Sequence, residues 1–159
     1  MRVTTTGLLA LALALSGCGE GGEGGGDAYG GFDPAAGFVG CDGALTYTPG
    51  LEMVTDSGAL TVRLVSASPA PPDVGDNLWR FEVLDADGAP AEGAFVEIEP
   101  FMPGHGHGTF PRFSASDERE GGYDMEPFNL FMPGYWEMRV TVVGAGPRES
   151  VLFDFCIEG

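Results

Sequence analysis

The only two histidines of the chain, His105 and His107, stand two positions apart in a glycine-rich segment that opens with the residues Phe-Met-Pro-Gly. The same four residues recur thirty positions later, so Met102 of the first copy has a counterpart in Met132 of the second. Side chains two positions apart on an extended backbone point to the same side, so both imidazoles can reach one ion. Imidazole binds copper, zinc and nickel, whereas a thioether selects Cu(I). The two histidines and two methionines therefore predict a copper site, provided that the two Phe-Met-Pro-Gly segments are neighbours in the fold.

The same residues also suit a purely structural pair of turns. Proline fixes φ and glycine accepts a left-handed conformation, so Met-Pro-Gly is favourable turn chemistry. Met102 and Met132 can fill the end of a core as adaptable apolar side chains. The two imidazoles can form hydrogen bonds with carbonyl groups of their own loop. Both interpretations stay open from the residues alone.

Other catalytic and binding motifs are absent from the sequence. It contains no nucleophile elbow, no zinc-protease helix motif and no phosphate-binding loop. The segment 85–88, Asp-Ala-Asp-Gly, has fewer oxygen ligands than a calcium-binding loop needs. It predicts a hairpin turn instead. Two histidines and no free thiol leave little for nucleophilic catalysis. We therefore expect that the protein is not an enzyme.

The first residues are typical of a secreted lipoprotein. Residues 1–17 combine an early arginine, a short apolar run and small residues, which predicts a signal peptide. The run is shorter than the ~20 apolar residues that a membrane-spanning helix needs. The sequence Leu-Ser-Gly-Cys that ends at Cys18 resembles the bacterial lipobox, which predicts lipidation of Cys18. Gly19 stands where an inner-membrane retention signal would have aspartate, so the expected location is the cell envelope, with the outer membrane favoured.

Composition divides the rest of the chain into two parts. Residues 18–39 are rich in glycine and predict a flexible tether that reaches about 25 Å. Residues 40–159 predict one domain that is large enough for a core. Without the signal peptide, the chain has six arginines, no lysine and 24 aspartates and glutamates, which gives a formal net charge of −18. This charge excludes nucleic acid as a partner, leaves the lipid at Cys18 as the membrane contact, and attracts cations.

Two further cysteines, Cys41 and Cys156, lie at the two ends of the predicted domain. In an oxidising compartment such a pair predicts a disulfide, which would place the first and last strands side by side. Two thiolate metal ligands are the alternative.

Alternation of apolar and polar residues predicts an all-β fold. The two tryptophans fall on the apolar faces and are expected in the core. Strands are predicted at 60–64, 79–83, 94–98, 136–142 and 151–156, with shorter ones at 44–47 and 122–128. Turn residues cluster at 68–72, 85–88, 116–122 and 144–147. About seven short strands with a disulfide from start to end describe an immunoglobulin-like β-sandwich.

Several short motifs in this order resemble the YtkA-like domain, a relative of the FixH group. They are found at 77–90, 93–96, 102–103, 106–108, 122–123 and 131–136. The resemblance covers about 60–155 and implies a small immunoglobulin-like sandwich in a bacterial envelope protein without enzymatic activity. Some such domains are fused to heavy-metal efflux adaptors, and FixH-type proteins are linked to assembly of a copper-containing oxidase. A lipid anchor replaces the transmembrane helix of FixH proteins here.

Two functions follow from these observations. The first is a lipid-anchored envelope protein that binds copper through the histidine and methionine loop. The alternative is an interaction or assembly module that binds another envelope protein without a metal.

Overall fold

The computed structural model describes residues 40–91, 93–112, 114–119 and 122–159. The predicted signal peptide at 1–17, the lipidation site Cys18 and the tether at 18–39 lie outside the described residues. Within the described part, no helix is long and apolar enough to cross a membrane.

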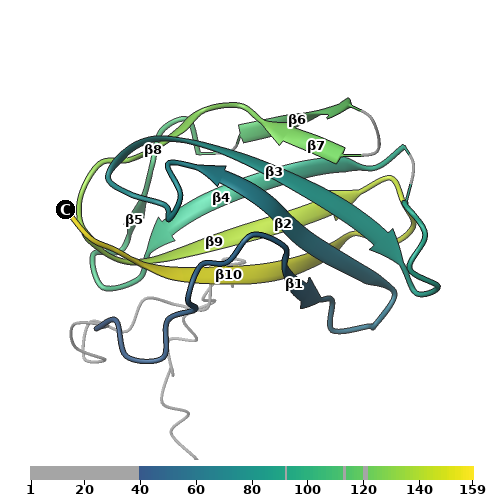
Figure 1. Cartoon of the computed structure of the whole chain (residues 1–159), viewed down its shortest axis with the longest axis horizontal. Coiled ribbons are helices and arrows are strands. Elements are labelled where there is room, and N and C mark those ends of the chain that lie inside the picture. The colour runs from purple at the N-terminus through teal and green to yellow at the C-terminus, as the bar shows by residue number, and fades with distance from the viewer. Residues whose placement is uncertain (1–39, 92, 113, 120–121) are drawn as a thin grey trace, which may run out of the picture. The chain divides into compact units, whose positions relative to one another are not determined.

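The described chain is all-β and forms two antiparallel layers that pack face to face (Figure 1). One layer contains β1, β2, β3 and β7, and the other contains β4, β9 and β10. The strands are β1 (Leu51–Val54), β2 (Leu60–Ser68), β3 (Gly75–Asp85), β4 (Phe95–Met102), β5 (His107–Gly108), β6 (Ser114–Arg119), β7 (Gly122–Met125), β8 (Phe128–Leu130), β9 (Gly134–Val143) and β10 (Glu149–Ile157). The predicted β-sandwich is confirmed, and the described residues form ten strands where about seven were predicted, because short strands such as β5 and β8 add to the long ones.

Strand β6 joins the two layers at one side. It pairs with β7 in the first layer and with β4 in the second. Strand β8 extends the first layer by pairing with the beginning of β3, and β5 extends the second by pairing with the end of β4. The β4–β5 hairpin and the beginning of β9 therefore lie at one end of the sandwich.

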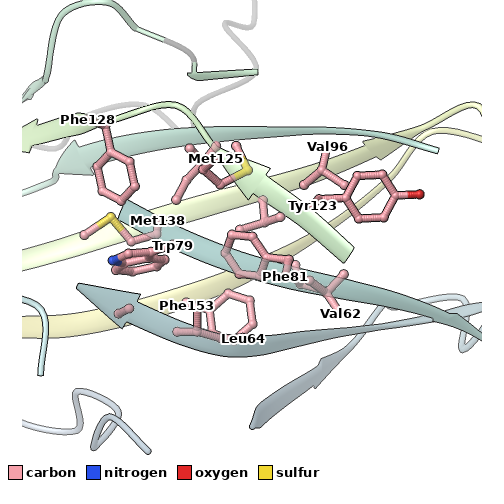
Figure 2. Close-up of a cluster of buried hydrophobic side chains, with 14 of the residues drawn as sticks. Val62, Leu64, Trp79, Phe81, Val96, Tyr123, Met125, Phe128, Met138 and Phe153 are labelled. Carbon is pink, nitrogen blue, oxygen red and sulfur yellow. The ribbon is translucent and has the colours of Figure 1, made fainter. Parts of the chain in front are cut away.

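The core forms because alternate residues of the long strands point between the layers (Figure 2). Trp79 on β3 packs edge-on against Phe155 on β10, with ring centroids 5.6 Å apart. Phe81 meets Phe153 across the layers, with ring centroids 5.7 Å apart and planes tilted by 43°. Trp79 and Trp136 are 2% and 0% exposed, so both tryptophans belong to the core as predicted. Each large apolar side chain buried in this way contributes about 1.5–3 kcal/mol.

Two segments differ from the sequence-based prediction. The predicted strand at 44–47 is a single parallel bridge between Leu45 and Phe155, and strand β1 follows it in the chain. The predicted turn at 116–122 is mostly β6. This strand carries no apolar alternation, but its backbone pairs on both edges, with Ser114 opposite Ile98 and Ser116 opposite Met125. Hydrogen bonding to two neighbours makes a strand of a segment whose composition favours a turn.

The disulfide between Cys41 and Cys156 is present, with Cα atoms 5.3 Å apart and 115 positions between them in sequence. The backbone nitrogen of Leu45 donates to the carbonyl of Asp154, 2.9 Å away, so the first described segment runs beside β10. The disulfide leaves neither sulfur as a thiolate for a metal.

Three side chains that can lose a proton, Tyr135, Glu137 and Asp154, lie close together on β9 and β10. Glu137 lies directly opposite Asp154, and the hydroxyl of Tyr135 donates to Asp154 at 2.8 Å. Burial raises the pKa of Glu137, Asp154 raises it further, and Arg139 opposes the change. Burial also raises the pKa of Tyr135 far above its usual range, and the hydrogen bond to Asp154 adds to this because it needs the phenolic proton.

Replacing Glu137 with glutamine should stabilise the protein at pH 7. Because the pKa of Glu137 is raised above 4.5 on folding, its stabilising contribution is present at low pH and is lost as the pH rises through the folded pKa. Glutamine carries no charge, so we expect a gain of at most about 1 kcal/mol at pH 7 and none below about pH 4. Urea unfolding at both pH values measures this, with exposed Glu126→Gln as the control. An equal gain at the two pH values would show that the charge of Glu137 is not the cause.

Candidate metal centre

The two histidines lie in a tight hairpin between β4 and β5. Met102 pairs with His107, and Phe101 pairs with Gly108. The carbonyl of Met102 accepts hydrogen bonds from the backbone nitrogens of His105, at 3.1 Å, and Gly106, at 2.9 Å. Gly106 has a φ of +67°, which residues with a side chain rarely adopt. The hairpin is therefore built by backbone groups and glycine, and it presents both imidazoles from one short turn.

Gly108 allows the two hairpin strands to approach each other. A Cβ atom at this position would lie 2.5 Å from the carbonyl oxygen of Pro100. Backbone atoms cannot move aside as the end of a side chain can, so any larger residue must shift β5 away from β4.

Replacing Gly108 with alanine should lower the free energy of unfolding by about 1–3 kcal/mol, the usual effect of forcing an extra carbon into a packed site. Urea denaturation measures the change. Gly40→Ala is the matched control because a Cβ atom there meets nothing within 4 Å. A loss at Gly108 no larger than that at Gly40 would mean that the hairpin can accommodate the methyl group.

The two imidazoles are close enough to share one ion. Their ring centroids are 5.5 Å apart and their planes are inclined by 47°. A metal lies about 2.0–2.1 Å from an imidazole nitrogen, so two rings on one ion have centres at most about 6.4 Å apart. His105 is exposed, His107 is half-buried, and the buried Nδ1 of His107 has no hydrogen-bond partner in the described part of the chain. An unsatisfied nitrogen of this kind is costly unless a ligand engages it.

The two Phe-Met-Pro-Gly segments are neighbours, as the copper hypothesis requires. Strands β4 and β9 pair, and a Cβ atom on Gly134 would lie only 2.8 Å from the terminal methyl carbon of Met102. Met102 also faces the same side of the hairpin as His107, because the two residues are directly opposite each other. Met102 is 1% exposed and Met132 is partly buried against the core, so both methionines have a packing role as well.

Phe131 connects the hairpin to the core and was not among the predicted site residues. Its ring stacks on His107, with centroids 5.3 Å apart and planes inclined by 25°. It also packs edge-on against Trp136 at 5.6 Å, and the indole nitrogen of Trp136 donates to the carbonyl of Met132 at 3.0 Å. Only its membership of the repeated motif could have indicated it. The orientation of His107 is therefore tied to the second Phe-Met-Pro-Gly segment.

The two imidazoles and the thioether of Met102 are the metal ligands that this end of the sandwich offers. Across the described residues, no three side chains of the types His, Cys, Asp and Glu come together as metal ligands. Structural zinc sites usually have four such ligands, more than the described residues bring together here. Two imidazoles and a thioether remain, a combination that fits Cu(I).

Comparison with known proteins gives one result. A family model described as YtkA-like matches residues 55–141, which is more than half of the chain and includes both Phe-Met-Pro-Gly segments. No curated protein and no solved structure matches.

Proposed function

The chain belongs to the YtkA-like family, and we propose that it is a lipid-anchored protein of the bacterial cell envelope that binds Cu(I) as cargo. His105 and His107 would be the main ligands, with Met102 as the third donor and Met132 close by. The observation that carries the proposal is the 5.5 Å separation of the two imidazole rings, together with the pairing of Met102 opposite His107.

Each ligand has a distinct part in this proposal. His105 is exposed and would meet the incoming ion first, whereas His107 is held by the stacked ring of Phe131. The thioether of Met102 makes the set selective for Cu(I) over harder ions. The acidic surface draws cations towards the domain. The lipid at Cys18 and the tether at 18–39 would keep the site close to a membrane, and the protein would carry copper without catalysing a reaction.

Competition with a chromophoric Cu(I) chelator such as bicinchoninate tests the proposal. The double variant His105→Ala/His107→Ala should bind Cu(I) at least 100-fold more weakly than the native protein, because only one or two sulfur ligands remain. Met102→Leu conserves volume and should weaken binding about tenfold. Met53→Leu is the control, because Met53 pairs with Val62 at the opposite end of the sandwich. Equal affinity of micromolar or weaker in native and double variant would overturn the copper assignment.

The alternative function is an interaction or assembly module without a metal. It is favoured by the exposed aromatic residues near the hairpin, since Phe110 is 93% and Phe131 is 50% exposed. Crosslinking in cells followed by mass spectrometry distinguishes it. Recovery of only the free monomer would count against this alternative, whatever the outcome of the copper titration.

A further inference from the structure

Strand β4 has two different partners on the edge next to the hairpin. It pairs with β5 at Phe101 and Met102 and with β6 at Glu97 and Ile98. Glu99 and Pro100 lie between these two paired stretches of β4. A hollow of about 460 Å³ lies between this stretch of β4 and the segment that follows β5. It is lined by Glu99, Pro100, Phe101, His107, Thr109, Phe110 and Arg112, with two glycines of the hairpin.

A buried carboxylate lines this hollow. Glu99 is 7% exposed, although it stands on the face of β4 that alternation assigns to solvent. Arg112 donates from Nε to Oε1 of Glu99, and Arg139 lies opposite Glu99 on β9. The side chain of Arg112 is 60% exposed while that of Glu99 is only 10% exposed. The guanidinium on Glu99 thus comes from a side chain that is mostly in solvent, and a second guanidinium could take its place without leaving the buried carboxylate unpaired.

An exposed aromatic ring stands beside the carboxylate. Phe110 is 93% exposed and lines the same hollow as Phe101. Burying a phenylalanine side chain contributes about 1.5–3 kcal/mol, so a ring left in water favours any partner that covers it. Aromatic and arginine side chains that fill pockets are the usual anchors of protein interfaces. A guanidinium can also lie against an aromatic face.

We propose that this hollow is a docking site for an arginine side chain of a basic partner protein, which replaces Arg112 on Glu99 and packs against Phe110. The guanidinium fork matches a carboxylate better than an ammonium group does. The formal net charge of −17 steers a basic partner towards the domain. The docking site does not depend on copper, although a partner bound here would touch the hairpin that carries His107.

An NMR titration of the full chain tests the site. The probe is the peptide acetyl-Ala-Arg-Ala-amide, and its neutral control has citrulline in place of arginine. Saturable shifts are expected for backbone amides between 99 and 112, with the citrulline peptide binding at least tenfold more weakly. Glu99→Gln should abolish the shifts, and Phe110→Ser should weaken binding several-fold.

The most discriminating experiment compares the peptide affinities of two arginine variants. Arg112→Ser removes the internal partner of Glu99, so the peptide should bind at least threefold more tightly. Arg148→Ser is the matched control, because Arg148 is 63% exposed and pairs with Glu97, a residue outside the hollow. Equal affinities of the two variants would overturn the proposal, as would equal binding of the two peptides. Agmatine binding tenfold more tightly than the peptide would reassign the hollow to a small organic cation.

Discussion

Replacing both Cys41 and Cys156 with serine should lower the free energy of unfolding by about 4–5 kcal/mol. The disulfide closes a loop of 115 positions, and a loop of that length restricts the unfolded chain strongly. The same bond holds the segment around Leu45 against β10, where few other backbone contacts exist. Urea denaturation of the native protein and the double variant, under oxidising conditions, measures the difference.

Reduction of the native protein is the control for this result. With a reductant present, the native protein should unfold at the same urea concentration as the double variant, and the variant should not respond. A loss below about 1 kcal/mol would show that the folded state gains little from the cross-link or that the reduced unfolded chain keeps native-like contacts.

Replacing Trp136 with alanine should lower the free energy of unfolding by about 3–5 kcal/mol, the usual range for removing a buried tryptophan. Trp136 is 0% exposed and packs edge-on against Phe131, which in turn stacks on His107. The substitution should therefore also loosen the hairpin, so Cu(I) affinity should fall although none of the proposed ligands has changed. Urea unfolding and the chelator competition measure the two effects.

Two phenylalanine substitutions separate packing from hydrogen bonding. Trp136→Phe removes the donor to the carbonyl of Met132, whereas the indole nitrogen of Trp79 has no partner among the described residues. We expect Trp136→Phe to be more destabilising than Trp79→Phe by about 1 kcal/mol, the net value of one hydrogen bond. A larger loss at Trp79 would contradict this account of the second turn.

Most long strands and the core could be predicted because alternation is a local property. In β9 and in residues 79–83 of β3 every second residue is apolar, and a strand with such a pattern buries one face. The pairing of Cys41 with Cys156 could also be predicted, since no other pair was available once Cys18 was assigned to the lipid. Strand β6 could not, because its pairing with β4 and β7 leaves no periodic signal in its composition.

The residues of the candidate site could also be predicted only in part. The sequence indicated His105 and His107 by their rarity and spacing, and Met102 and Met132 by repetition. It could not indicate that Phe131 stacks on His107, because that contact joins two turns that are separated by some twenty residues. Alternation along β4 assigns Glu99 to the solvent face, whereas its side chain is only 10% exposed and pairs with Arg112.

The fold class, most residues of the core, the disulfide and the types of ligand that are available could therefore be predicted from the sequence. These depend on composition and on periods of two residues. Only the folded arrangement shows which turns meet, with Met102 opposite His107 and against Gly134, and that Glu99 lines a hollow beside Phe110. The register of paired strands and the distance between loops depend on contacts between segments that are far apart in the sequence, and no local pattern encodes them.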